Sequence, residues 1–263
     1  MARHSLRRAV RLGSVATVLA LLAGCAGRSD DARLVIVTTN DVSGKTSPCG
    51  CHTPKGGLAR RAAFLDSLRA ARKHVLVVDA GGFFPVTDDE REAAPYLLHA
   101  MARLGTQAAG VGANELRFGY AFVRENARSA GVTLVSANLM RFDNGQPAFD
   151  PWRVIEAPGV GAKGVRVGVF GLMPESSELG PARDSLRITS AEEAASRCIR
   201  ELRAKGANVI VLLSQLGKAA GDSVAAHVAG IDLLVGGGGV PVLPSGTAIG
   251  NGHGVALYGG FAG

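Results

Sequence analysis

Short apolar runs rich in valine, isoleucine and leucine alternate with amphipathic stretches along most of this chain. The apolar runs predict buried β-strands at residues 34–38, 74–78, 106–111, 132–137, 165–172, 208–213 and 231–235. Helical spacing of apolar residues predicts helices at 58–72 and 96–104, and Ser190 followed by Glu193 predicts a capped helix that ends before Gly206. Strands that alternate with helices predict an α/β fold with largely parallel sheets, in one domain over residues 34–263.

The chain begins with a segment that has the composition of an export signal. Four arginines precede an apolar stretch at residues 15–22, which is shorter than the roughly 20 apolar residues of a membrane-spanning helix. The next residues, Leu-Ala-Gly-Cys at 22–25, resemble the lipobox of bacterial lipoproteins. We therefore expect residues 1–24 to be removed, and residues 25–33 to form a tether with lipid on Cys25. This predicts a protein exported to the periplasmic or cell-surface side and held at the membrane. The alternatives are an ordinary secretory signal or a short anchor helix.

The positive net charge comes mostly from this leader. The full sequence has 29 Lys and Arg against 22 Asp and Glu, and the leader carries four arginines and no acidic residue. Without the leader, 25 basic residues stand against 22 acidic ones, and they are scattered along the chain. We therefore expect no nucleic-acid polymer among the partners. The sequence leaves open which small molecule or protein binds.

Polar and glycine-rich segments follow the predicted strands, at the sheet edge where open α/β proteins bind ligands. They lie at residues 39–44, 79–84, 112–119, 136–139, 214–217 and 236–240, and Gly-Gly-Leu-Ala-Arg at 56–60 opens the first helix. In order and spacing they resemble the metallophosphoesterase domain of the periplasmic, calcineurin-like 5′-nucleotidase family. The resemblance covers residues 34–263 and implies a four-layer α/β sandwich of the metallo-dependent phosphatase type. Family members continue further, so we expect either a minimal one-domain form or a truncated sequence.

The family's metal positions are mostly changed in this chain. The resemblance implies enzymes that hold two divalent metals, which activate water for attack on a phosphate ester. Asp41 is the one retained ligand. The changed positions read Ser43, Gly82, Ala113, Asn114, Gln215, Gly238 and Val240. One carboxylate with a few amides does not hold two such ions, so we expect no full dimetal centre, and the cofactor is left unassigned.

Three residues remain as catalytic candidates: Asp41, Asn114 and Glu115. Family-type hydrolysis would survive only if a neighbouring side chain took over from a lost ligand, for which the candidates are Asp79, His52 and His253. The structural alternatives are that Glu115 pairs with Arg117 and that Asp79 bonds neighbouring loop amides.

A thiol pair, Cys49 and Cys51, is followed by His52 in the loop before the first helix. We expect the loop to face the strand ends near Asp41. Three interpretations stay open: a structural disulfide, a reversible redox pair, or soft ligands for zinc or copper together with His52. In the last case Asp41, or Asn114 or Gln215 as a weaker oxygen donor, would complete the site. The same Cys-Gly-Cys resembles a degenerate branch of the 5′-nucleotidase-like proteins. Cys198, on the core face of a predicted helix, is interpreted as a buried structural thiol.

The leading hypothesis is thus a lipid-anchored envelope protein with a 5′-nucleotidase-like domain that has lost most dimetal ligands and serves a redox, metal-handling or binding role. The alternative is an active metal-dependent phosphoesterase or 5′-nucleotidase that hydrolyses nucleotides or phosphate esters. A third possibility is a purely structural envelope lipoprotein.

Overall fold

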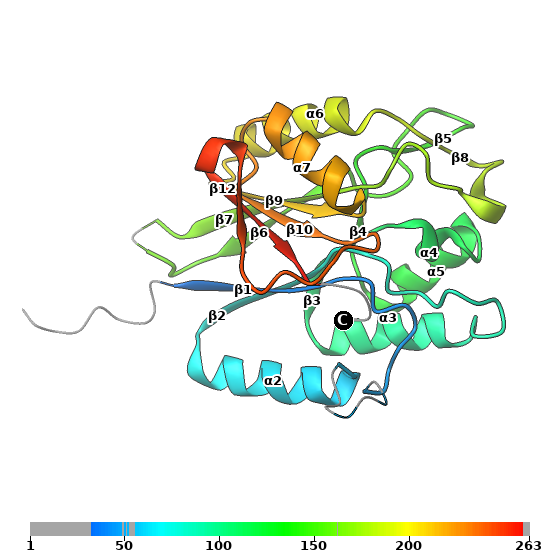
Figure 1. Ribbon diagram of the computed structural model, residues 1–263, viewed down its shortest axis with the longest axis horizontal. Helices are drawn as coiled ribbons and strands as arrows, with labels where there is room; N and C mark the ends of the chain where they lie inside the picture. The colour runs from blue at the N-terminus through cyan, green and yellow to red at the C-terminus, as the bar shows by residue number, and fades with distance from the viewer. Residues whose placement is uncertain (1–32, 49, 51, 53–55, 162, 260–263) are drawn as a thin grey trace, which may run out of the picture.

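Two β-sheets lie face to face between two layers of helices in the computed structural model, which describes residues 33–48, 50, 52, 56–161 and 163–259 (Figure 1). The predicted leader, Cys25, Cys49 and Cys51 lie outside the described residues. Within the described part, no helix has both the length and the apolar character needed to span a bilayer. The arrangement confirms the predicted α/β fold and its four layers.

The first sheet has four parallel strands in the order of the sequence. They are β1 (Leu34–Thr39), β2 (His74–Asp79), β3 (Thr106–Gly110) and β4 (Leu134–Val135). In the register of β1 and β2, Thr39 lies beside Asp79, so the segments after both strands start at the same edge. The predicted strand at 132–137 is shortened to two paired residues.

The second sheet has six strands in the order β11, β12, β10, β9, β7, β6. Its four inner strands are parallel, and the edge strands β6 and β11 are antiparallel to their neighbours. The strands are β6 (Trp152–Ala157), β7 (Val165–Leu172), β9 (Val209–Ser214), β10 (Leu233–Gly236), β11 (Thr247–Ile249) and β12 (Gly254–Tyr258). A separate antiparallel pair joins β5 (Leu139–Arg141) to β8 (Leu186–Ile188).

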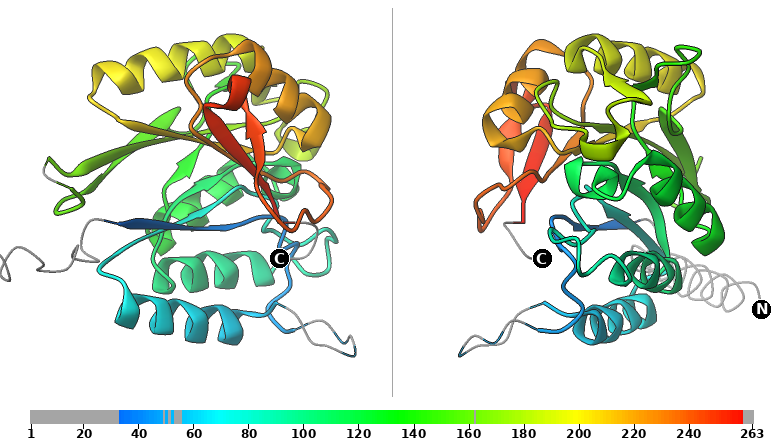
Figure 2. Two further views of the ribbon diagram at one scale, coloured as in Figure 1. Left: turned by 60° about the vertical axis from the view of Figure 1, so that its left-hand side comes forward. Right: turned by 90° about the vertical axis from the view of Figure 1, so that its right-hand side faces the viewer.

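Helices cover the outer face of each sheet (Figure 2). On the four-stranded sheet lie α2 (Leu58–Ala71), α3 (Ala93–Arg103) and α5 (Tyr120–Ala130), and on the six-stranded sheet lie α6 (Ala191–Ala204) and α7 (Gly217–His227). Short turns are α4 (Ala113–Leu116), η3 (Gly180–Ala182) and η4 (Gly250–Gly252).

The core between the sheets is made of aliphatic side chains from both inner faces. Val78, Val169, Val211 and Leu213 belong to this cluster and are fully buried. Each such side chain contributes roughly 1.5–3 kcal/mol through its removal from water. This layer fixes the two sheets against each other, and therefore also the loops that leave their carboxyl ends.

The packing of α6 follows the sequence prediction. The Ser190 hydroxyl accepts a hydrogen bond from the Glu193 N–H at 3.4 Å, as expected for the cap. Cys198 is completely buried on the core face of α6, and burial raises the pKa of its thiol to about 12. This confirms that Cys198 is a structural thiol.

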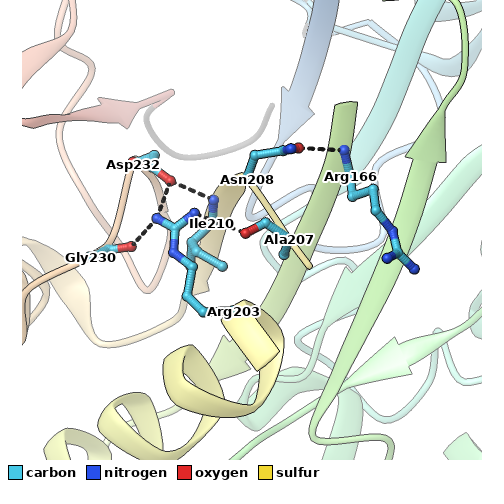
Figure 3. Close-up of polar contacts among 7 residues, drawn as sticks. All are labelled: Arg166, Arg203, Ala207, Asn208, Ile210, Gly230 and Asp232. Atoms are coloured by element: carbon cyan, nitrogen blue, oxygen red, sulfur yellow. Dashed lines mark hydrogen bonds and ion pairs between the residues drawn. The ribbon is translucent and has the colours of Figure 1, made fainter. Parts of the chain in front are cut away.

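A polar clasp ties the end of α6 to the sheet (Figure 3). The Arg203 guanidinium donates to the carbonyl oxygens of Ala207 and Gly230, at 3.0 and 3.3 Å, and to the Asp232 carboxylate at 3.0 Å. Asp232 in turn accepts a bond from the Ile210 N–H at 2.7 Å. The clasp lies at the amino ends of β9 and β10, so it fixes the strands at the edge away from the carboxyl-end loops.

Candidate functional site

Loops from both sheets meet where the carboxyl ends of the strands lie. Asp41 follows β1, Gly82 follows β2, Gln215 follows β9, and the glycine run at 237–239 follows β10. Asp41 and Gln215 are 174 residues apart in sequence and in direct contact. The topology thus brings the predicted Asp41 together with two segments that the sequence placed at former metal positions.

Asp41 is a buried carboxylate, 4% exposed, and both of its oxygens accept hydrogen bonds. Oδ1 accepts from the side-chain amide of Gln215 at 3.1 Å and from the N–H of Gly238 at 3.2 Å. Oδ2 accepts from the N–H of Gly239 at 3.1 Å and from the side-chain amide of Asn40 at 3.2 Å. Four N–H donors therefore compensate the buried charge, in keeping with the rule that buried charges are paired or hydrogen-bonded.

The backbone around Asp41 is held in an uncommon conformation. Asp41 has φ 49° and Ser43 has φ 51°, both in the left-handed region that non-glycine residues seldom adopt. The N–H of Asp41 donates to the Gly81 carbonyl and the N–H of Ser43 to the Gly82 carbonyl, each at 2.9 Å. These bonds fasten the loop after β1 to the loop after β2 and aim the Asp41 carboxylate at the glycine run.

Glycines surround the Asp41 and Gln215 side chains because no larger residue fits. A Cβ at Gly82 would lie 2.3 Å from Oδ1 of Asp41, and the residue has φ +72°. A Cβ at Gly237 would lie 2.3 Å from Nε2 of Gln215, and one at Gly112 would lie 2.6 Å from its Oε1. The Gln215 amide thus fills a slot walled by glycines. In this arrangement, position 82 has no room for the bridging carboxylate that the family resemblance implies there.

The glycine run at 237–239 binds a carboxylate of the chain itself. Backbone N–H groups in such loops bind anions, and here the anion is the chain's own Asp41 carboxylate.

Glu115 lies on α4, completely buried, and joins two loops. Its carboxylate accepts backbone N–H bonds from Gly82 at 2.9 Å, Phe84 at 3.0 Å and Gly112 at 2.7 Å. Burial raises its pKa to about 7, against the opposing effect of the three donors. The expected pair with Arg117 is wrong: Arg117 instead contacts Asp88 at 3.3 Å, because the Glu115 side chain is turned into the loops.

Asp79 ends β2 and is also completely buried. It accepts a hydrogen bond from the Thr39 hydroxyl at 2.5 Å and one from the Gly81 N–H at 2.9 Å. Burial raises its pKa to about 6, and the nearby Arg61 partly opposes the shift. The expectation that Asp79 bonds neighbouring loop amides is confirmed.

The two histidines proposed as substitute ligands do not join Asp41. His253 directly precedes β12, whose parallel partner β10 carries the glycine run at its other end. His253 is therefore at the opposite edge of the sheet, and its proposed role is wrong. His52 is exposed, whereas Asp41 is buried. Its thiol neighbours Cys49 and Cys51 lie outside the described residues.

A cleft of about 320 Å³ opens beside Asp41 and Gln215. Asn114, half-buried on α4, lines it together with Ser43 and Ser177, so two of the three catalytic candidates share one cleft. No Lys, Arg or His lines it among the described residues. Over the same residues, no three His, Cys, Asp or Glu side chains cluster as metal ligands. The donors around Asp41 are N–H groups, which repel cations, so the residues present do not fit a dimetal centre.

The Gln215 contact is the functional feature that sequence reasoning missed. The sequence indicated position 215 as a changed metal position and as a weak oxygen donor to a metal at the thiols, and not as a hydrogen-bond donor to Asp41. The glycines at 82, 112 and 237 were a signal for it, because each leaves space that the Asp41 and Gln215 side chains fill.

Comparison with curated proteins gives partial matches to nucleotidases, and no protein-family model matches the chain. The chain is 25% identical over 219 residues to a 2′,3′-cyclic-nucleotide 2′-phosphodiesterase/3′-nucleotidase of Yersinia enterocolitica. This alignment covers 73% of this chain and 33% of the relative. The chain is also 30% identical over 230 residues to a snake venom 5′-nucleotidase of Gloydius brevicauda, covering 78% of this chain and 36% of the relative. The chain thus spans about a third of the length of these relatives.

Solved structures give matches of the same kind. A 5′-nucleotidase precursor from Thermus thermophilus has a TM-score of 0.76 at 27% identity, over 88% of this chain and 49% of that one. The calcineurin-like phosphoesterase YfkN from Bacillus subtilis has a TM-score of 0.73 at 20% identity, over 87% of this chain and 81% of that one. The homologues and structural neighbours of this chain are thus 5′-nucleotidases and calcineurin-like metallophosphoesterases, and the chain has the α/β fold of their phosphatase-type structures.

Proposed function

We propose that this chain is an exported binding domain built on the phosphoesterase fold, in which the former metal position is closed by the protein's own hydrogen bonds. The observation that carries the proposal is the environment of Asp41. Both carboxylate oxygens accept N–H bonds, Oδ1 from Gln215 and Gly238 and Oδ2 from Gly239. A carboxylate that serves a metal keeps a lone pair directed at the ion, with imidazoles or other carboxylates beside it.

Binding a metal at Asp41 would require these bonds to break. The Gln215 amide would have to turn its N–H group away, and the N–H groups of Gly238 and Gly239 would remain directed at the cation. No second carboxylate would help, because Gly82 has no room for one. Activation of water by two metals therefore has no support in these residues, and ligand binding in the cleft remains as the function that fold and site share.

The leader and the thiol pair extend this proposal from the sequence. A lipid on Cys25 would hold the domain at the outer side of a membrane. Outside the reducing cytosol, Cys49 and Cys51 are able to form a disulfide with each other. We propose that they act as a redox or metal-handling pair beside the domain, with a structural disulfide as the alternative.

The second candidate function is hydrolysis of nucleotides or other phosphate esters. It is favoured by the 30% identity to a snake venom 5′-nucleotidase, which extends over 78% of this chain. It requires a hydrolytic centre that does not depend on the ligands replaced at positions 82, 215 and 238.

A hydrolysis assay that measures free phosphate, p-nitrophenol and the nucleotide products separates the two functions; the products of the cyclic nucleotide are measured because its ring opening releases no free phosphate. The purified protein is tested on AMP, on 2′,3′-cyclic AMP and on p-nitrophenyl phosphate with added Mn²⁺, Zn²⁺ or Mg²⁺, and compared with an Asp41→Asn variant. We expect no turnover above the variant's background with any metal. Turnover that the Asp41→Asn exchange abolishes would establish hydrolysis and refute the binding proposal.

The thiol proposal has a separate test. Alkylation of the protein is followed by mass spectrometry across a series of redox buffers. A Cys49–Cys51 disulfide that opens within the physiological range supports the redox role. A pair that resists both reduction and alkylation would leave only the structural disulfide.

A further inference from the structure

A second hollow lies at the far edge of the four-stranded sheet from Asp41. It is formed by α5, by the residues that lead into β4, and by the segment at 146–151. Its volume is about 580 Å³. β4 is one edge of the sheet and β1, which carries Asp41 at its end, is the other (Figure 1). We call this hollow the α5 groove; it shares no lining residue with the cleft beside Asp41.

Two arginines line the α5 groove without a counter-ion. Arg124 and Arg128 are four residues apart on α5, and therefore on one face of the helix. Among the described residues, neither has a carboxylate within ion-pair distance. The Arg124 guanidinium lies over the Tyr120 ring, 5.3 Å from its centroid. Like charges at this spacing destabilise a helix slightly. The pair is thus a small cost to the fold that a bound anion would offset.

A third arginine contacts a residue that lines the groove. Arg153 on β6 donates a hydrogen bond to the hydroxyl of Thr133, which itself lines the groove. Asp150 is the one acidic residue in the lining. Arg128 also lies in the last turn of α5, where the helix dipole favours a cation. The dipole does not account for Arg124, one turn earlier, or for Arg153, and the balance of charge at the groove stays positive.

The side of the groove opposite the arginines carries apolar residues that are held in place. Phe149 lines it and packs edge-on against Tyr120, with 5.6 Å between the ring centroids. The Tyr120 hydroxyl donates to the Ala148 carbonyl at 2.8 Å, which fastens α5 to the segment opposite. Pro147 and Pro151 complete this side. A ligand here meets guanidinium forks on one side and an ordered apolar surface on the other.

We propose that the α5 groove binds a phosphate monoester through Arg124 and Arg128, with the organic part of the ester against Phe149. A phosphate monoester carries about −1.5 to −2 charges at pH 7, which matches two unpaired guanidinium groups, and arginine forks bind phosphate oxygens in pairs. The phosphate belongs either to a soluble metabolite or to the headgroup of an anionic lipid. The proposal does not depend on whether the Asp41 site is active.

Phenylphosphonate is a suitable probe, because its phosphorus–carbon bond is not open to phosphoesterase hydrolysis. Calorimetric titration compares it with benzyl alcohol, which lacks the charge, on the purified protein and on Arg124→Ala and Arg128→Ala variants. Arg200→Ala, which removes an exposed arginine of α6, is the matched control. Vesicles of phosphatidylcholine with and without phosphatidic acid form the lipid arm. Thermal unfolding verifies that each variant is folded.

We expect each groove variant to weaken phenylphosphonate binding roughly tenfold or more, and the control to leave it unchanged. Arg124→Lys and Arg128→Lys retain the charge without the fork and should fall in between. If the groove variants lose phenylphosphonate but bind phosphatidic acid vesicles as the control does, the ligand is a soluble ester. If they lose binding to the vesicles and not to phenylphosphonate, the ligand is a lipid headgroup. Loss in both arms shows that the groove binds the phosphate of either source. Equal binding by the groove variants and the control in both arms would overturn the proposal, as would equal affinity for benzyl alcohol.

Discussion

Replacement of Asp41 by asparagine tests the hydrogen-bonded site through the sign of its effect on stability. The carboxylate accepts four bonds, two at each oxygen. An asparagine presents its NH₂ group to one of the two pairs of donors, so two bonds are lost and the remaining two lose their charge assistance. A buried bond lost in this way costs about 1–3 kcal/mol, and reorientation of the Gln215 and Asn40 amides recovers part of it. We expect a net loss of about 2–4 kcal/mol in the free energy of unfolding.

A metal site predicts that the same exchange causes no loss of stability. In a metal-free dimetal centre, the ligating carboxylates repel one another, so neutralising one leaves stability unchanged or raises it. Urea unfolding at pH 8 in the presence of EDTA, followed by circular dichroism, measures the difference. Asp89→Asn, at an exposed acidic residue, is the control and should change stability by less than about 0.5 kcal/mol. An Asp41→Asn protein as stable as the parent, or more stable, would refute the hydrogen-bonded site.

Three further predictions concern the fold. Burial raises the pKa of Asp79 to about 6 and of Glu115 to about 7, from 3.8 and 4.5, so the folded chain keeps protons that the unfolded chain releases. The stability that these protons contribute is complete below about pH 4 and is lost as the pH rises to about 7. The urea midpoint of unfolding should therefore be lower at pH 8 than at pH 5. Equal midpoints would contradict the raised pKa values. Arg203→Ala removes the clasp of α6 and should lower the free energy of unfolding by about 1–2 kcal/mol, because the clasp is partly exposed. Ser190→Ala removes the cap of the same helix and should cost about 0.5–1 kcal/mol; both losses are read from urea midpoints, and unchanged midpoints would mean that the contacts are not formed in solution.

The fold could be predicted where local pattern and burial agree. The strand at Val165–Leu172 was predicted with its observed bounds, since a buried parallel strand reads as a continuous apolar run. The edge strand β6 was not predicted, because Arg153 and Glu156 interrupt its apolar residues and only Ile155 in it is buried. The helix α5 was missed because it buries little beyond Val123 and Ala127 among polar neighbours. The last strands, β11 and β12, are short and lie in a glycine-rich stretch.

Asp41 could be predicted from the sequence as a site residue, but its contacts could not. Asp41 stood out because it follows a strand in the first family-like segment. Its partners could not be predicted, because the contact with Gln215 depends on the packing of one sheet against the other. The glycines at 82 and 237 looked like losses of function in the sequence, whereas in the structure they make room for that contact. The same limit applies to Glu115, which was expected to pair with a neighbour in sequence and instead accepts backbone N–H bonds from two loops.

Metal stoichiometry tests the central claim most directly. The protein is prepared with Cys49 and Cys51 replaced by serine, so that these thiols bind no metal, and is equilibrated with Mn²⁺ and Zn²⁺ before elemental analysis. The hydrogen-bonded site predicts substoichiometric metal that the Asp41→Asn exchange does not change. Two tightly bound metal ions per chain, lost in the Asp41→Asn variant, would contradict it.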